Sequence, residues 1–482
     1  MFKNYINTQK QNIISSVCDL ITYPSISMET NNPNYPFGKH CAESLKYFLR
    51  LANSLGFKTK NVDGYCGWAE FGSGDTLIGI VGHLDVVPAI EDDWEFSPFT
   101  ATINKNRIYG RGAIDDKGPV IASLYAMKAV MDYYKDNNLN LNKRVRLIVG
   151  LNEEKDWKCI NYYKEHEEIP SIGFSPDSDF PCIYAEKSVL SLLLKDDMPA
   201  SKSPFSFSKL VKKAPIIRFK EIDCANNAIN VVPKFCSALL EIDTINIQDL
   251  IIFLKQRIDF YNYEIDLYKL DEHTLKITSH GKSAHSAHPE LGINAISKLL
   301  ILLNDLFIQY KVNYPLIYKY CKFIGDDYLG TRLGINVKDE SGNLTLNTSQ
   351  FFIKDNKLHI GINLRIPVKF SIDSIIGKFE YIFSKNCINV VGKTEALYID
   401  KNNKLVKELC SIFNETCGTA FEPFAIGGAT YARAFPNFIS FGMNFPRDKD
   451  MCHQVDEFIE IDKLILSTNI YAKAIYSLLN NF

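Results

Sequence analysis

The sequence lacks the features that mark exported, membrane-spanning or redox-active proteins. Its 12 cysteines form no Cys-x-x-Cys pair, which argues against a zinc ribbon, a thiol redox motif and a disulfide framework. The densest apolar stretch, residues 299–303, is far shorter than the roughly 20 residues that a bilayer requires, and the first residues contain no apolar signal core. We therefore expect a soluble, cytoplasmic protein with no membrane partner.

The sequence is also poor in net charge. The formal net charge is −2, and no arginine-rich or lysine-rich run occurs, so neither nucleic acid nor an anionic membrane surface is favoured as a partner. A small-molecule ligand is expected instead. The chain is long, however, and its 482 residues with 46% hydrophobic content exceed what a single hydrophobic core usually organises. Two domains are therefore predicted.

The first third of the chain alternates helical and extended patterns, which favours an α/β domain with a mostly parallel central sheet flanked by helices. Helices are predicted at residues 12–21, 41–55 and 117–133, and strands at 57–60, 76–81 and 144–151. Buried parallel strands deliver the residues that follow them to one edge of the sheet, where ligands gather.

The composition changes after about residue 187, where lysine, serine and proline become frequent. The middle segment, 188–394, reads as an inserted antiparallel α+β module, with strands at 270–278 and 358–367 and a helix at 294–307. The α/β pattern then returns, with helices at 404–415 and 461–479 and a strand at 438–442. The predicted domains are therefore 1–187 with 395–482, a discontinuous domain, and 188–394.

Potential metal ligands lie at the ends of apolar runs or beside turns: His83, Asp115, Glu154, Asp177 and His453. Neutral imidazole and carboxylate oxygen suit zinc, and a shared carboxylate can hold two such ions roughly 3.5–4 Å apart. Each motif alone has an ordinary interpretation, such as a packed histidine–aspartate pair or a solvated pair of glutamates. All of them together indicate a metal centre that hydrolyses amide bonds.

Two neighbours of these residues have predicted supporting roles. Asp85 lies two residues after His83, so in an extended backbone it faces the same side and can accept a hydrogen bond that fixes the tautomer of His83. Asp116 follows Asp115 at the start of a predicted helix, where a carboxylate stabilises the positive end of the helix dipole.

Several motifs together resemble the dizinc metallopeptidase and aminoacylase superfamily, and most closely the peptidase V-type bacterial dipeptidases, which are Xaa-His dipeptidase or carnosinase-like enzymes. The motifs are Gly-His-Leu-Asp-Val-Val-Pro at 82–88, Gly-Arg-Gly through Lys-Gly at 110–118, Asn-Glu-Glu at 152–154, Ser-Pro-Asp at 175–177, Asn-Val-Val-Pro at 230–233, Gly-Lys-Ser-Ala-His at 281–285, Asn-Leu-Arg at 363–365 and Gly-Gly-Ala-Thr-Tyr-Ala-Arg at 427–433. They span nearly the whole chain, and they imply a zinc-peptidase-like catalytic domain with an inserted lid.

The resemblance implies a role for each ligand. Asp115 would bridge two Zn²⁺ ions, His83 and Asp177 would complete one site, and Glu154 and His453 would complete the other. Cobalt or manganese would accept the same donors. The peptide bond between Asp115 and Asp116 is expected to be cis, as at the matching family position.

A base that is not itself a ligand must take a proton from the water shared by the two ions, and Glu153 is the candidate for this task.

The resemblance also assigns residues of the lid. His285 would stabilise the oxyanion, and Asn230 and Arg365 would grip the substrate carboxylate, for which the planar guanidinium of arginine is suited. The alternative for Arg365 is a surface salt bridge. Gly427 and Gly428 would let backbone amides approach the substrate, because no Cβ intrudes.

The predicted function is a monomeric metallo-dipeptidase that hydrolyses unblocked dipeptides. A lid that clamps the carboxylate end near the ions leaves little room for longer peptides, and a lid of this length resembles two fused halves that supply the histidine within one chain. Two alternatives stay open. One is an N-acyl amino acid deacylase of the same superfamily, and the other is a catalytically inactive binding scaffold.

Overall fold

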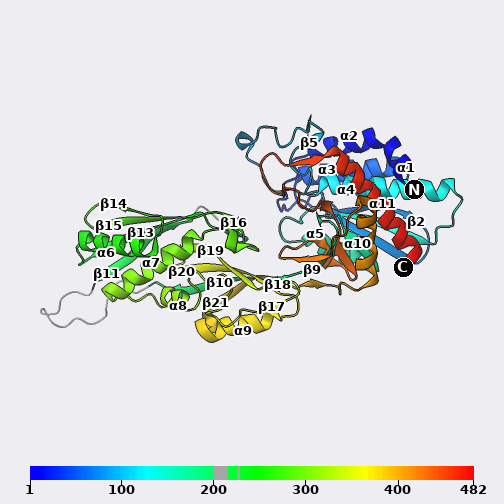
Figure 1. Cartoon of the computed structure of the whole chain (residues 1–482). Helices are drawn as coiled ribbons and strands as arrows, with labels where there is room; N and C mark the ends of the chain where they lie inside the picture. The colour runs from blue at the N-terminus through cyan, green and yellow to red at the C-terminus, as the bar shows by residue number, and fades with distance from the viewer. Residues whose placement is uncertain (199–214, 225–227) are drawn as a thin grey trace. The chain divides into compact units, whose positions relative to one another are not determined.

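The computed structural model describes residues 1–198, 215–224 and 228–482, which form two compact units (Figure 1). Unit 1 consists of Met1–Ala185, Leu397–Phe424 and Ala429–Phe482, and unit 2 consists of Glu186–Ala396 and Ala425–Gly428. The domain boundaries expected from the sequence, after residues 187 and 394, lie within two residues of the places where the chain passes between the units. The grouping of residues 425–428 with unit 2 was not anticipated.

The main sheet belongs to the α/β part of the chain and is parallel at its centre. Its order is β1 (Lys58–Val62), β2 (Cys66–Gly72), β6 (Lys143–Gly150), β3 (Thr76–His83), β7 (Ile172–Ser175), β24 (Phe438–Ser440), β9 (Ile183–Glu186) and β22 (Leu397–Tyr398), with β23 (Phe424–Ile426) beside β9. The pairs β6–β3, β3–β7 and β7–β24 are parallel, whereas β1–β2, β2–β6 and β24–β9 are antiparallel. The parallel sheet predicted from the sequence thus forms the centre, and antiparallel strands extend it.

Helices cover this sheet and its edges. They are α1 (Lys3–Thr8), α2 (Lys10–Ile21), α3 (Lys39–Ser54), α4 (Lys117–Asp136), α5 (Lys158–His166), α10 (Lys404–Cys417) and α11 (Ile461–Asn481). Helix α4 packs on β3 and β6 and contacts α2 and α11, and α3 packs on β1 and β2 (Figure 1). Gly56 has φ +96° directly after α3, the left-handed conformation that terminates a helix at least cost in glycine. Pro119 occupies the first turn of α4, where no N–H partner is required.

Unit 2 is built from antiparallel sheets and helices around one apolar core. One sheet has the order β19 (Thr345–Lys354), β20 (Lys357–Ile366), β10 (Ser188–Asp197), β21 (Ile388–Thr394), and another has β11 (Ile216–Asp223), β13 (Phe235–Asp243), β15 (Thr274–His280), β14 (Ile265–Lys269). The helices are α6 (Ile247–Tyr261), α7 (Ala295–Tyr310), α8 (Pro315–Phe323) and α9 (Ile372–Phe383). This is the antiparallel α+β module expected from the sequence.

The strand predicted at 270–278 begins later than expected, because its first residues form a turn. The carboxylate of Asp271 accepts a hydrogen bond from the backbone N–H of His273 at 2.7 Å, and the strand runs from Thr274 to His280. Aspartate competes for nearby backbone donors in this way at turns.

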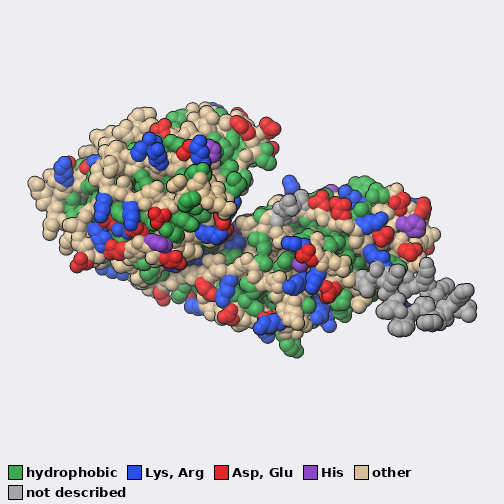
Figure 2. Space-filling model, turned by 180° about the vertical axis from the view of Figure 1, so that it is seen from behind, with side chains coloured by type: hydrophobic (Ala, Val, Ile, Leu, Met, Phe, Trp, Pro, Cys, Tyr) green, Lys and Arg blue, Asp and Glu red, His purple; other side chains and the backbone are tan. Residues whose placement is uncertain are grey.

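The surface and the helices agree with the charge and hydropathy of the sequence. Figure 2 shows lysine and arginine interspersed with aspartate and glutamate on the face that it presents, in keeping with the formal net charge of −2. No helix in the described ranges is long and apolar enough to cross a membrane. One feature departs from expectation, since Cys224 and Cys236 are joined as a disulfide.

Candidate metal centre

The parallel strands of unit 1 bring chemically reactive side chains to one edge of the sheet. Strand β3 ends at His83, which is 0% exposed. Strand β6 ends at Gly150 and is followed by Glu153 and Glu154, and β7 ends shortly before Asp177. Because β6, β3 and β7 run parallel, the residues after them gather at the same carboxyl edge.

Asp115 lies between two histidines, and each of its carboxylate oxygens faces one of them. Oδ1 lies 3.0 Å from Nε2 of His83, and Oδ2 lies 3.0 Å from Nε2 of His453. Asp177 approaches the same His83 nitrogen at 3.6 Å, and Glu154 lies 3.0 Å from the His453 nitrogen. The donors therefore fall into two groups that share one aspartate. All five predicted ligands are brought together, although 338 residues separate Asp115 from His453 (453 − 115).

The donor set fits divalent cations. Nε2 of His83 is buried and makes no hydrogen bond among the described residues. Carboxylate oxygens of Asp115 and Asp177 lie 3.0 and 3.6 Å from it, so the nitrogen and these oxygens face a common space. Neutral imidazole and carboxylate oxygen are the donors that zinc and similar ions accept. A site of this composition can bind a divalent metal.

The pKa values of the clustered side chains are shifted by burial and by the charged groups beside them. Burial, the largest cause, and the neighbouring Asp115 raise the pKa of Glu154 to about 7. Burial alone would lower the pKa of His453, but hydrogen bonding to Asp115 and Glu154 raises it to about 11. Burial also raises the pKa of Glu153 well above its ordinary value. Crowded, buried carboxylates destabilise their own charged forms, and a cation between them relieves this cost.

Asp85 supports the site differently from the prediction. Nδ1 of His83 donates to the backbone carbonyl oxygen of Asp85 at 2.9 Å, while the carboxylate lies 3.6 Å from that nitrogen. The carboxylate instead accepts the backbone N–H groups of Glu153 at 3.0 Å and of Glu154 at 3.1 Å. Asp85 therefore fixes both the imidazole of His83 and the segment that carries the two glutamates.

Asp116 is buried beneath the site. The peptide bond between Asp115 and Asp116 is cis, which confirms the sequence prediction. The carboxylate of Asp116 accepts the backbone N–H of His83 at 3.0 Å and makes no capping hydrogen bond to α4. Its side chain thus holds the end of β3.

Glu153 lies beside one of the two groups. One oxygen of Glu153, one of Asp177 and a nitrogen of His83 all lie within 4.8 Å of one another. A carboxylate at this distance can reach a water molecule held between the donors, which is the geometry that a general base requires.

The residues assigned to the lid lie in unit 2. His285 is exposed and pairs in register with Val231 through the short strands β16 (Ala284–His285) and β12 (Val231–Val232). Asn230 is half-buried, and its carbonyl oxygen accepts the N–H of Ser286 at 2.9 Å, which ties Asn230 to the turn that follows His285. The two paired segments therefore place His285 and Asn230 side by side.

Arg365 is buried beneath the same turn and is 5% exposed, so it is not a surface residue. Nη1 donates to the carbonyl oxygen of Gly427 at 2.9 Å, and Nη2 donates to Oγ of Ser286 at 3.3 Å. A Cβ on Gly427 would lie 2.8 Å from that of Ala287, which explains the glycine, whereas one on Gly428 would meet only a flexible isoleucine methyl group at 3.2 Å.

Two further residues at the site, Tyr431 and Glu457, have no role predicted from the sequence. The ring of Tyr431 is buried edge-on to His83 with centroids 6.2 Å apart, and its hydroxyl lies 2.7 Å from Sγ of Cys159. Tyr431 falls within the 427–433 motif, so a signal was present. Glu457 is fully buried and contacts the loop that carries Asp115, and no pattern in the sequence marks it.

The fold and the donor set together define a metal-dependent hydrolase. Peptidase family M20/M25/M40 matches residues 79–477 of the chain, and the chain belongs to this family. The superfamily membership predicted from the sequence is thereby confirmed.

Named relatives cover the chain almost completely. It is 36% identical over 482 residues to "Putative dipeptidase YtjP" of Bacillus subtilis (strain 168), covering 98% of both chains. It is 32% identical over 486 residues to "Putative dipeptidase SAB1611c" of Staphylococcus aureus (strain bovine RF122 / ET3-1), covering 99% of both. Among solved structures, human carnosine dipeptidase 1 superposes with a TM-score of 0.58 at 13% identity, covering 99% of this chain and 98% of the other. At that identity, the structural likeness shows the fold.

Proposed function

We propose that this protein is a metal-dependent dipeptidase that hydrolyses the peptide bond of unblocked dipeptides. The observation that carries the proposal is the placement of Asp115, whose two oxygens each lie 3.0 Å from a different histidine. A carboxylate shared in this way suits two cations held a few ångströms apart. The dipeptidase names of the relatives that span the whole chain support the substrate class.

The proposed occupants are two Zn²⁺ ions, for which cobalt or manganese could substitute. His83 and Asp177 with Oδ1 of Asp115 would hold one ion, and His453 and Glu154 with Oδ2 of Asp115 would hold the other. Bound divalent ions supply Lewis acidity, which acidifies a water molecule and polarises a carbonyl group.

The remaining chemistry is assigned to side chains. Glu153 would take the proton from the attacking water and deliver it to the leaving amine, because it lies half-buried beside the donors without being needed as a ligand. Asp85 would keep Glu153 in place through the hydrogen bond that it accepts from the Glu153 backbone N–H.

Unit 2 would provide substrate recognition. His285 would stabilise the oxyanion, and Asn230 and Arg365 would bind the substrate carboxylate, with Gly427 and Gly428 giving close backbone approach. The support is local, since Arg365 is hydrogen-bonded to Gly427 and to the turn that carries His285. We further propose a monomer, because one chain contains every assigned residue, and the cytoplasm stays the predicted location.

Hydrolysis of a panel of compounds tests the proposal. The panel contains free dipeptides, their N-acetylated counterparts, tripeptides and N-acyl amino acids, each assayed with zinc and with a chelator. We expect turnover of free dipeptides that the chelator abolishes. Preference for the acylated compounds would instead identify a deacylase, and no hydrolysis of any compound at saturating zinc would favour an inactive scaffold.

A further inference from the structure

Glu457 is a buried carboxylate with no part in the proposed catalytic or substrate-binding roles. It lies four residues after His453 and directly before β26 (Phe458–Glu460), and it is 0% exposed. Its Oε2 accepts a hydrogen bond from Nη1 of Arg111 at 2.7 Å. Arg111 is itself buried and lies over the ring of Trp94, 5.0 Å from its centroid. Both partners of the ion pair are therefore buried.

The other hydrogen bonds to this carboxylate come from the backbone of the loop that carries Asp115. Oε2 also accepts the N–H of Gly112 at 3.1 Å, and Oε1 accepts the N–H of Ile114 at 2.8 Å and of Asp115 itself at 3.2 Å. Both oxygens of Glu457 therefore point at N–H donors. Charged acceptors make stronger hydrogen bonds than neutral ones, so this arrangement fixes the loop.

The two segments are also joined along their length. The N–H of Gly110 donates to the carbonyl oxygen of Glu457 at 2.9 Å, and β26 pairs with β5 (Arg107–Tyr109) in antiparallel register. The segment that supplies His453 runs into β26, and the loop that supplies Asp115 follows β5. The two are therefore held together where they join these paired strands.

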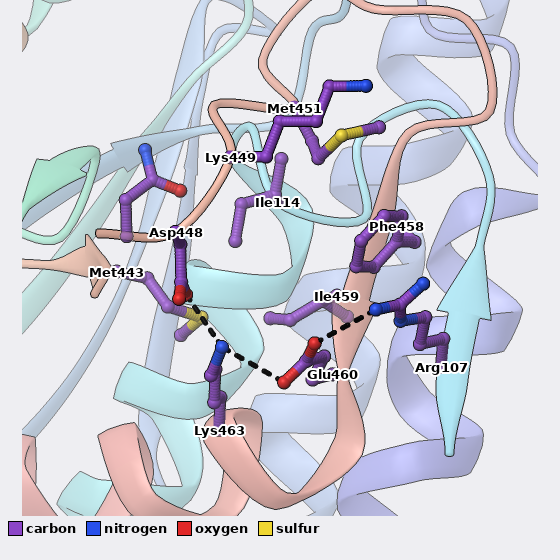
Figure 3. Close-up of a pocket in the computed structure, with 11 residues that line it drawn as sticks. Arg107, Ile114, Met443, Asp448, Lys449, Met451, Phe458, Ile459, Glu460 and Lys463 are labelled. Carbon is purple, nitrogen blue, oxygen red and sulfur yellow. Dashed lines mark hydrogen bonds and ion pairs between the residues drawn. The ribbon is translucent and has the colours of Figure 1, made fainter. Parts of the chain in front are cut away.

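A small cavity of about 120 Å³ lies beside this junction (Figure 3). Ile114 and Met451, the neighbours of the two metal-site segments, line it together with Phe458. At its edge, Glu460 bridges Arg107 and Lys463, as the dashed lines show. These side chains are 31–40% exposed, and ion pairs of this kind contribute little. Glu460 is therefore a matched control for Glu457.

We propose that Glu457 is a positioning residue of the metal centre, which holds Asp115 in register with the segment that carries His453. The proposal rests on the proposed function. Because each oxygen of Asp115 faces a different histidine, a shift of its backbone disturbs a ligand of both ions. Residues that orient ligands from behind influence metal affinity in this way.

Substitution Glu457→Gln tests the proposal, because the amide keeps the shape but turns one acceptor oxygen into a donor that faces other donors. Zinc affinity is measured by competition with a chromophoric chelator, and the melting temperature is recorded with and without zinc. We expect the affinity to fall by about 10- to 100-fold and the stabilisation by zinc to shrink. Glu460→Gln should bind zinc like the wild type.

Other outcomes decide against the proposal. A Glu457→Gln protein that melts earlier without zinc but binds zinc with wild-type affinity would show a structural role only. If that variant does not fold, Glu457→Asp, which keeps the charge on a shorter side chain, is measured instead, and wild-type affinity there also overturns the proposal. If the variants bind zinc like the wild type and the wild type hydrolyses dipeptides, only the positioning role of Glu457 is refuted and the proposed function stands. A wild-type protein that binds no divalent ion refutes both the positioning role and the proposed function.

Discussion

At the scale of single residues, Glu153 and Glu154 are neighbours with different assigned tasks. Glu154 lies 3.0 Å from Nε2 of His453, whereas Glu153 faces His83 and Asp177. Both backbone N–H groups donate to the Asp85 carboxylate. Asp85 thus sets the orientation of two consecutive side chains that point to different donor groups.

Replacement of Glu153 distinguishes a role as general base from a role as metal ligand. Glu153→Ala should leave the metal content near that of the wild type and lower the turnover number by about 10²–10⁴, the usual contribution of a general acid or base. Metal content by elemental analysis and steady-state kinetics on a free dipeptide check this. Asp156→Ala, which removes a half-exposed carboxylate three residues further on, should change neither quantity. Equal losses of metal and turnover in Glu153→Ala would instead make Glu153 a ligand.

The candidate ligands could be named from the sequence, whereas the long-range contacts that hold them in place could not. His83, Asp115 and Asp177 each follow or end a recognisable apolar run or turn, and those motifs are local. The contact from the Asp85 carboxylate to the backbone at 153–154 spans two strands, and Glu457 contacts a loop more than 340 residues away. Such contacts leave no periodic trace in the sequence, so only the folded chain reveals them.

At the scale of elements, helix α4 begins with a buried lysine. Lys117 is 0% exposed, and Nζ donates to the carbonyl oxygen of Tyr23 at 2.6 Å. Its aliphatic stem lies against Gly112, where a Cβ would be 2.8 Å from Cδ of the lysine. Burial, the largest cause, lowers the pKa of Lys117 from 10.5 to about 7, although nearby acidic groups oppose this.

This shift predicts how the stability of the metal-free protein depends on pH. The unfolded chain keeps the proton of Lys117 up to pH 10.5, while the folded chain keeps it only up to about pH 7. Unfolding therefore takes up a proton between these values, and the free energy of unfolding should rise with pH across that window, by at most about 1.4 kcal/mol per pH unit from this group.

Urea unfolding in chelator between pH 7 and 10 measures the effect against Lys117→Met, which keeps the length of the side chain without the charge. The difference between the two slopes isolates Lys117 from the other groups that titrate in this range. Parallel slopes would mean that Lys117 stays charged in the folded protein.

Element prediction succeeded where one periodicity ran without interruption. The helices expected at 404–415 and 461–479 are observed at Lys404–Cys417 and Ile461–Asn481, and both carry a continuous apolar face. The strand expected at 270–278 was wrong at its start, because the Asp271 carboxylate accepts a hydrogen bond from the backbone N–H of His273 and forms a turn inside an alternating pattern. The strand expected at 57–60 is present as β1 (Lys58–Val62), but its antiparallel pairing with β2 was not predicted, since pairing direction is a tertiary property.

At the scale of the whole molecule, the segments of unit 1 that flank the middle of the chain meet in the main sheet. Strands β9 and β22 are neighbours there, and the N–H of Ile399 donates to the carbonyl oxygen of Tyr184 at 2.9 Å. Unit 1 therefore has its own core, its own sheet and both ends of the intervening segment close together, which is the geometry that tolerates insertion and excision.

Excision of the middle segment follows from this geometry. A chain with residues 188–394 replaced by a short glycine–serine linker should fold and bind zinc with near wild-type affinity, because His83, Asp115, Glu154, Asp177 and His453 all belong to unit 1. It should not hydrolyse dipeptides, because the assigned oxyanion and carboxylate partners are removed with unit 2. Calorimetry with and without zinc and the dipeptide assay measure both effects. A shortened chain that retains turnover would show that unit 2 takes no part in catalysis, and one that folds without binding zinc would place an essential ligand within the excised residues.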